Sequence, residues 1–366
     1  MNKGPAPELA AWLQLNAGFL IGPDRLRRIA DCLGLPRIAG ASLEELAGAG
    51  NMGLPAARRL KGYLSALDPI REWEQAMDLG ISLRTWQDSD YPATLRSVPD
   101  APLVLYVWGE LDQERPALAV VGSRQPSPYG RRMTRSLVRD AAAHLVIVSG
   151  LARGIDTEAH RAALECGGVT WAVLGSGLGR IYPPENSALA HEIAARGGCV
   201  LSELPLAAEP LAAHFPLRNR IVAALSWGTV VVEGRDKSGA LITARLAGEQ
   251  GREVFAVPGP ADSPLSEAPH RLISQGAKLA RSMADIWPEL PPAAVMPPSR
   301  SSAAERTLAE PHKKILELLG SETRSLEDLG QESGMDLPSL SQAMFEMELQ
   351  DLVVSAPGQF YAKKSD

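Results

Sequence analysis

The sequence predicts an α/β protein built on a doubly wound, mostly parallel sheet, with a helical domain before the sheet and a winged helix after it. From about Ile81 to Leu290, short apolar runs alternate with stretches of helical periodicity. Several of these runs are continuous rather than alternating, which is typical of parallel strands covered on both faces. The regions before and after this stretch have mainly helical periodicity instead. We therefore expect a Rossmann-like middle domain with a smaller domain at each end.

The first domain, residues 1–67, is expected to be helical. Apolar residues recur at spacings of three and four, first at Leu9, Trp12 and Leu13 and again at Leu26, Ile29 and Leu33. Turns such as Gly22-Pro23 separate the predicted helices, as in SAM or helix-hairpin-helix modules, where helix starts can present backbone N–H groups to phosphates. The alternative is a bundle that only packs against its neighbour.

The middle domain, residues 81–290, is expected to form the Rossmann-like sheet with right-handed crossovers. Strands are predicted at Leu103–Val107, Leu118–Val121, Val146–Ser149, Thr170–Leu174, Cys199–Ser202, Thr229–Glu233, Glu253–Val257 and Lys278–Ala280. Helices are predicted at Arg131–Ala143, Thr157–Cys166, Asn186–Ala195, Arg218–Leu225 and Leu241–Gln250.

Residues 291–311 are predicted to be a linker, because they are rich in proline, serine and alanine and have no periodicity. Residues 312–366 then predict three helices and a hairpin, which together make a winged helix. The helices are expected at His312–Leu319, Leu326–Glu332 and Pro338–Gln350, and the hairpin strands at Leu352–Ser355 and Phe360–Ala362.

The third helix of the winged helix, which reads DNA in many such domains, is acidic here. Leu337–Val354 contains no Lys or Arg but holds Glu346, Glu348 and Asp351. Because this surface would repel phosphates, protein contact or a structural role is favoured over DNA reading.

Composition sets further limits. The 366 residues carry a net charge of −6, which argues against wholesale nucleic-acid binding. Arginine dominates the basic residues and suits phosphate contact, but a GC-rich genome explains the excess equally well. Cys32, Cys166 and Cys199 lie far apart, so neither a disulfide framework nor a zinc site is indicated. No apolar run predicts a membrane span or a secretory signal, and a cytoplasmic location is expected.

Small, hydroxyl and cationic residues follow four of the predicted strands. These segments are Gly122-Ser123-Arg124, Ser149–Asp156, Gly175–Gly179 and Glu233–Gly239. In a doubly wound sheet, ligands bind outside the carboxyl ends of the strands. Glycine lets backbone amides approach an anion, and helix starts add partial positive charge. Four such segments on one edge predict a phosphate-rich ligand.

Two nucleotide motifs are incomplete. Lys237-Ser238 resembles the end of a Walker A loop, but Asp236 stands where that loop needs glycine. Gly175-Ser-Gly177-Leu-Gly179 has its third glycine one residue too early for the dinucleotide fingerprint. ATP hydrolysis and NAD binding are therefore disfavoured, and no cofactor is expected.

The segment His214–Ile221 is the most unusual in the chain. It places Arg218, Asn219 and Arg220 in the first turn of a predicted helix, where cations oppose the macrodipole. An anionic ligand would remove this conflict, and Phe215 could stack on a base. The alternative is that Phe215 fills the core while the arginines reach solvent.

Taken together, these motifs resemble those of the DprA/Smf family, and the resemblance covers nearly the whole chain. It implies that the Rossmann-like domain binds single-stranded DNA during natural transformation and helps to load a RecA-type recombinase. It also implies a homodimer through that domain, for which 264–278 is our candidate segment. The matching segments are Gly122-Ser-Arg124, Ser149–Asp156 with Ala159-His160, Tyr182-Pro-Pro-Glu-Asn186, Ser202-Glu203, Phe215–Ile221 and Lys237–Ala244.

Carried over by motif, the family's DNA pocket implies a defined set of binding residues. They are Ser123, Arg124, Arg153, Gly154, Phe215, Arg218, Asn219, Arg220, Lys237, Ser238, Gly239 and Thr243. No catalytic residue and no metal ligand is expected. We interpret Asp156 as a helix N-cap, with His160 hydrogen-bonded to it one turn later.

Two other functions stay open at this stage. One is a nucleotide-phosphate-binding hydrolase or carrier of a related Rossmann-like fold, in which Glu203 or Glu233 would act as general base. The other is an adaptor that works only through the helical domain and the winged helix.

Overall fold

The computed structural model describes residues 4–112, 115–291, 314–315, 318–319, 324–349, 353–356 and 360–363. The chain divides into two compact units, Met1–Pro297 and Pro298–Asp366. No helix in these described ranges is long and apolar enough to cross a lipid bilayer.

The first unit is built on a mixed sheet in the order β1-β2-β6-β5-β4-β3-β7-β8-β9. All neighbouring strands are parallel except β1 with β2 and β2 with β6, so the predicted doubly wound, mostly parallel class is confirmed. The strands are β1 (Ile81–Thr85), β2 (Val104–Gly109), β3 (Ala117–Val121), β4 (Val146–Ser149), β5 (Thr170–Val173), β6 (Cys199–Ser202), β7 (Gly228–Val231), β8 (Glu253–Ala256) and β9 (Lys278–Leu279).

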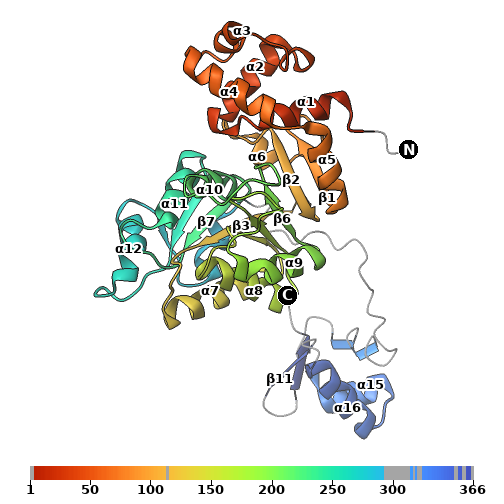
Figure 1. The fold of residues 1–366 in the computed structure, drawn as a ribbon. Helices are drawn as coiled ribbons and strands as arrows, with labels where there is room; N and C mark the ends of the chain where they lie inside the picture. The colour runs from red at the N-terminus through yellow and green to blue at the C-terminus, as the bar shows by residue number, and fades with distance from the viewer. Residues whose placement is uncertain are drawn as a thin grey trace. The chain divides into compact units, whose positions relative to one another are not determined.

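Helices cover both faces of this sheet. Figure 1 shows α7 and α8 together on one face and α10 and α11 on the other. Two separate buried clusters agree with this division, one with Leu137 of α7 and the other with Ile221 of α10. The helices are α6 (Ala93–Arg96), α7 (Pro128–Ala141), α8 (Ile155–Glu165), α9 (Ser187–Ala195), α10 (His214–Ala224), α11 (Gly239–Glu249) and α12 (Glu267–Ser274).

Each predicted strand is present, with bounds that shift by one or two residues. The sequence pattern missed β1, an edge strand that pairs antiparallel with β2. Its sequence Ile-Ser-Leu-Arg-Thr mixes polar and apolar residues, and only its two end residues are buried. A period-two pattern this short and incomplete gives little signal.

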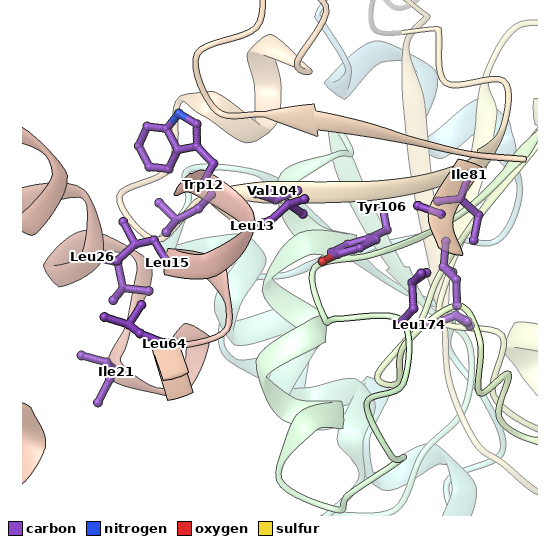
Figure 2. Packing of buried hydrophobic residues seen from close by; sticks show 14 of the residues in the cluster. Trp12, Leu13, Leu15, Ile21, Leu26, Leu64, Ile81, Val104, Tyr106 and Leu174 are labelled. Carbon is purple, nitrogen blue, oxygen red and sulfur yellow. The ribbon is translucent and has the colours of Figure 1, made fainter. Parts of the chain in front are cut away.

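The N-terminal helices share a core with the sheet. They are α1 (Pro7–Asn16), α2 (Pro23–Leu33), α3 (Leu43–Ala49), α4 (Leu54–Ala66) and α5 (Pro69–Asp78). One buried cluster runs from Leu13 and Leu15 of α1 to Val104 and Tyr106 of β2, as Figure 2 shows. The boundary predicted after residue 67 stays a prediction, but the helices before it are packed against the sheet.

The second unit contains β10 (Arg324–Ser325), α15 (Leu326–Ser333), α16 (Leu337–Leu349), β11 (Val353–Ala356) and β12 (Phe360–Lys363). The strands form an antiparallel sheet in the order β10-β12-β11, and Leu329, Leu340 and Met344 are buried between the elements. Most of the predicted linker 291–311 and half of the helix predicted at His312–Leu319 lie outside the described residues, as does Asp351.

The shared core makes a prediction about cooperativity. Leu13 is fully buried, so Leu13→Ala should destabilise the first unit by roughly 2 to 5 kcal/mol. Because α1 packs on β2, amide hydrogen exchange should accelerate in both the N-terminal helices and the sheet. Leu329→Ala in the second unit is the matched control. Faster exchange confined to the residues before β1 would show that the helices unfold independently.

Candidate functional site

A cavity of about 1040 Å³ lies at the carboxyl edge of the parallel strands. It is bounded by the loops after β3, β4 and β7 and by the first turns of α10 and α11. Most of the predicted binding residues line it, but Gly154 and Arg220 do not. Those that do are Ser123, Arg124, Arg153, Phe215, Arg218, Asn219, Lys237, Ser238, Gly239 and Thr243.

Gly154 lies outside the cavity lining and allows the loop after β4 to pack closely against the loop after β3. It is the N-cap residue of α8 with φ at 82°, and a Cβ at this position would lie 2.2 Å from the carbonyl oxygen of Ser123. The next amide, of Ile155, donates to that same oxygen over 3.0 Å. A side chain at residue 154 would therefore push away the loop that carries Ser123 and Arg124.

Arg218 forms a buried cationic part of the cavity wall, with 5% of its surface exposed. Its Nη1 donates to the carbonyl oxygens of Gly150, at 2.6 Å, and of Val173. Burial lowers the pKa of Arg218 to about 10, an effect that the nearby Asp156 carboxylate opposes, so the guanidinium stays charged at neutral pH. Among the described residues, Nη2 has no hydrogen-bond partner, which leaves one edge of the fork available to a ligand.

The predicted roles of Asp156 and His160 are wrong. Asp156 lies inside α8 and accepts hydrogen bonds from the amides of Gly150, at 3.1 Å, and Ala152, at 3.3 Å, so it clamps the loop after β4. His160 pairs through Nδ1 with Thr170 Oγ1 at 2.7 Å. That hydroxyl already donates to a carbonyl oxygen, so Nδ1 must carry the proton of the neutral ring.

The expected position of the arginines in α10 is also wrong. The helix begins at His214, so Arg218 and Arg220 lie in its second turn, where a macrodipole conflict no longer arises. Arg220 turns away from the cavity and forms a buried, bidentate ion pair with Glu203, with N–O distances of 2.7 and 2.6 Å. Its Nε also lies 3.2 Å from Asp100 Oδ2. Arg220 therefore stabilises α10 from the side opposite Arg218.

Two aromatic rings stand beside the cations of the cavity. Phe215 is half-buried, and its ring centroid lies 5.6 Å from that of Tyr182. The guanidinium carbons of Arg124 and Arg153 lie 5.9 Å from the rings of Phe215 and Tyr182, respectively. Tyr182, Gln125 and Arg235 line the cavity but were missing from the predicted set. The tyrosine could have been found, since it follows the glycine-rich segment after β5.

Charge is concentrated in this cavity. Its lining includes one carboxylate, Asp156, and five cationic side chains, Arg124, Arg153, Arg218, Arg235 and Lys237. The whole chain, in contrast, carries −6. The first turn of α11 adds to this field, because the hydroxyl of its N-cap residue Ser238 makes no capping bond to the helix amides. Within the described ranges, no group of His, Cys, Asp and Glu side chains could hold a metal ion.

The buried histidine predicts an acid-dependent loss of stability. Burial lowers the pKa of His160 to about 3, below the value of about 6.5 expected in the unfolded chain. Between these values the unfolded state binds the extra proton, so the free energy of unfolding should fall as pH falls, by up to roughly 1.4 kcal/mol per pH unit. Denaturant unfolding of the wild type and His160→Gln across this window tests it. The variant should lose this contribution, and parallel pH profiles would contradict the prediction.

Two family models match the chain. Residues 82–291 match the family model of DNA recombination-mediator protein A, and residues 297–359 match that of the DprA winged helix domain. Protein Smf of Escherichia coli K12 is 41% identical over 282 residues, which cover 74% of each chain.

Two solved structures are similar in fold and in sequence. DNA processing protein A from Streptococcus pneumoniae superposes with a TM-score of 0.66 at 35% identity, covering 76% of this chain and 96% of that one. The protein of the same name from Helicobacter pylori, whose structure describes a single-stranded DNA binding mode, gives 0.51 at 30% identity, covering 56% and 94%. The chain therefore belongs to the DprA/Smf family of DNA processing proteins.

Proposed function

We propose that the chain binds single-stranded DNA in the cavity at the sheet edge and passes the strand to a RecA-type recombinase. The observation that carries the first part is the combination of five cations, one carboxylate and two aromatic rings around one cavity. Phosphates and exposed bases are the two chemical features that such a lining recognises together.

The phosphate contacts come from side chains on separate segments. Arg124 follows β3, Arg218 lies on α10 and Lys237 precedes α11, so a bound strand would cross several strand ends of the sheet. The uncapped first turn of α11 offers backbone N–H groups to the same backbone. None of these contacts reads a base edge, so binding should depend weakly on sequence.

The rings of Phe215 and Tyr182 supply selectivity for a single strand. Stacking on an aromatic side chain needs a base whose face is free, and in a duplex both faces are covered by neighbouring pairs. Because every base has such a face, stacking adds affinity without sequence preference. The cavity should therefore prefer oligo-dT over a blunt duplex at equal ionic strength.

The transfer to a recombinase rests on family membership and on the mediator role in the family's description. The single-stranded DNA binding mode described for the Helicobacter pylori protein supports the binding half of the proposal. A homodimer through the Rossmann-like domain, with the segment 264–278 as candidate interface, remains a prediction of this proposal.

The two carboxylates that the hydrolase alternative needs as general bases, Glu203 and Glu233, are both engaged in hydrogen bonds. The Glu203 carboxylate is paired with Arg220 on both oxygens. The Glu233 carboxylate accepts hydrogen bonds from the amide and hydroxyl of Ser127, at 2.9 and 2.5 Å. A carboxylate held this way is poorly placed to take a proton from water beside a phosphate. We therefore favour binding without catalysis. Loss of oligo-dT affinity in full-length Arg124→Gln, whose helical domain and winged helix are unchanged, would exclude the pure adaptor.

Removing one cation should weaken binding and its salt dependence together. Arg124→Gln or Lys237→Gln should lower oligo-dT affinity and reduce the log–log salt slope by roughly 0.7 for each lost phosphate contact. Fluorescence anisotropy at several salt concentrations measures both. Arg59→Gln and Arg71→Gln, exposed arginines of α4 and α5, are the charge-matched controls. If the controls act as strongly as the cavity variants, binding is a diffuse charge effect and the pocket assignment is wrong.

Removing one ring should weaken binding with little change in the salt slope. Phe215→Leu and Tyr182→Leu should each cost roughly 1 to 3 kcal/mol of oligo-dT binding free energy, because a leucine retains bulk but offers no π-face. Duplex binding, measured in parallel, should change little. An equal loss for duplex and single strand would argue against base stacking.

A further inference from the structure

One wall of the cavity is formed by residues 203–214, the irregular stretch between β6 and α10 together with the first residue of α10, which we call the wall segment. Pro210 and Ala212 of this segment line the cavity, and Phe215 follows it directly. Between Ser202 and His214 the chain has neither helix nor strand, so its position must be fixed by contacts with other parts of the molecule.

On one side, the loop after β5 holds the wall segment through its backbone. The amide of Gly177 donates to Ala208 O over 2.9 Å, and the amide of Gly179 donates to Leu206 O over 3.0 Å. The approach is so close that a Cβ on Gly177 would lie 2.1 Å from the carbonyl oxygen of Pro205. These bonds fix the middle of the segment against the sheet.

On the other side, the N-terminal helices contact the wall segment near its start, middle and end. Asn16 Nδ2 donates to Glu203 O over 2.8 Å. Leu206 N donates to Glu72 Oε1 over 2.7 Å. The ring of Phe19 meets His214 edge-on, with centroids 5.3 Å apart. All three contacts come from residues outside the Rossmann-like sheet, on α1, α5 and the turn between α1 and α2.

Of the three contacts, the one made by Glu72 places a buried carboxylate against the wall segment. The side chain is 7% exposed, and its carboxylate lies beside the fully buried Tyr106, whose pKa is raised by burial first and by Glu72 second. A carboxylate is kept in such surroundings only if hydrogen bonds replace its water. A shift of Leu206 would leave its buried amide without an acceptor and would remove a hydrogen bond from the carboxylate, so this bond resists movement of the wall segment.

The same segment also reaches the cationic part of the cavity. Glu203, at its start, holds Arg220 of α10, two residues from Arg218. His214, at its end, is the first residue of α10 and precedes Phe215. The N-terminal helices thus contact the wall segment near both of its ends, at Glu203 and at His214. The second of these residues begins the helix that carries Arg218 and Phe215.

We propose that Asn16, Phe19 and Glu72 are positioning residues for the DNA cavity, and that the N-terminal helices and the bound strand are coupled through the wall segment. The proposal rests on the proposed function for its ligand. Because coupling between two sites is reciprocal, DNA in the cavity should tighten the same contacts that place Phe215.

The test compares variants that remove a contact with one that only weakens the helical core. Glu72→Leu removes the acceptor for Leu206 N, Phe19→Leu removes the edge-on ring, and Glu72→Gln retains an amide oxygen acceptor. Ile29→Ala, a fully buried residue of α2 with no hydrogen bond to the wall segment, is the matched control. Each full-length variant is assayed well below its melting temperature, for oligo-dT affinity and for amide exchange with and without oligo-dT.

We expect Glu72→Leu and Phe19→Leu to weaken oligo-dT binding by about tenfold, roughly what one lost buried contact is worth. Glu72→Gln should restore most of the affinity, and Ile29→Ala should stay within about twofold of the wild type. In the wild type, oligo-dT should slow amide exchange in residues 16–21 as well as in the wall segment. Glu72→Leu should abolish that distant effect.

Two results would overturn the coupling. One is wild-type affinity in both Glu72→Leu and Phe19→Leu, and the other is an equal loss in Ile29→Ala, which would reduce the contacts to general stability. Arg124→Gln in the same assay separates this failure from that of the proposed function. If Arg124→Gln weakens binding while the contact variants do not, only the coupling is refuted. If Arg124→Gln also binds as the wild type does, the cavity is not the DNA site and both proposals fall.

Discussion

The site depends on a buried guanidinium that the protein itself must solvate. Arg218 is almost completely buried, and a cation in that position needs carbonyl oxygens in place of water. Gly150 and Val173 provide them from the ends of the neighbouring strands β4 and β5. The bonds tie α10 to the sheet edge, and Asp156 supplies compensating charge while it holds the loop after β4. The cavity is therefore organised around one charge before any ligand arrives.

A second buried charge fixes the same helix from its other side. Arg218 and Arg220 are two residues apart, so they leave α10 on nearly opposite faces. One faces the cavity and the other meets Glu203 at the start of the wall segment. Removing one member of a buried ion pair leaves the other charge buried without a counter-charge, which lowers the free energy of unfolding by roughly 3 to 5 kcal/mol. Two buried arginines with separate partners thus set the rotation of α10 about its axis, and with it the direction in which Phe215 points.

Sequence reasoning located the cavity because parallel strands bring their carboxyl ends to one edge, which turns segments far apart in the chain into neighbours. It failed where partners are chosen by tertiary packing. Nothing in the spacing of Arg220 and Glu203 reveals that they pair. Asp156 and His160 lie one turn apart, but each is hydrogen-bonded to other groups. The start of α10 could have been placed better, because proline is tolerated in the first turn of a helix, so Pro216 is compatible with a helix that begins before it.

The opposing charges of the chain and the cavity bear on how the proposed ligand is selected. A net charge of −6 gives little long-range attraction for DNA, so affinity must come from contacts made inside the cavity. We expect the winged helix to add little, since α16 carries Glu346 and Glu348 and no basic residue. With few phosphates neutralised, the diffuse electrostatic binding that any duplex offers is weak. Stacking on Phe215 and Tyr182 then contributes a large part of the binding free energy. Only unpaired bases can make this contribution, because only they expose a face to the rings.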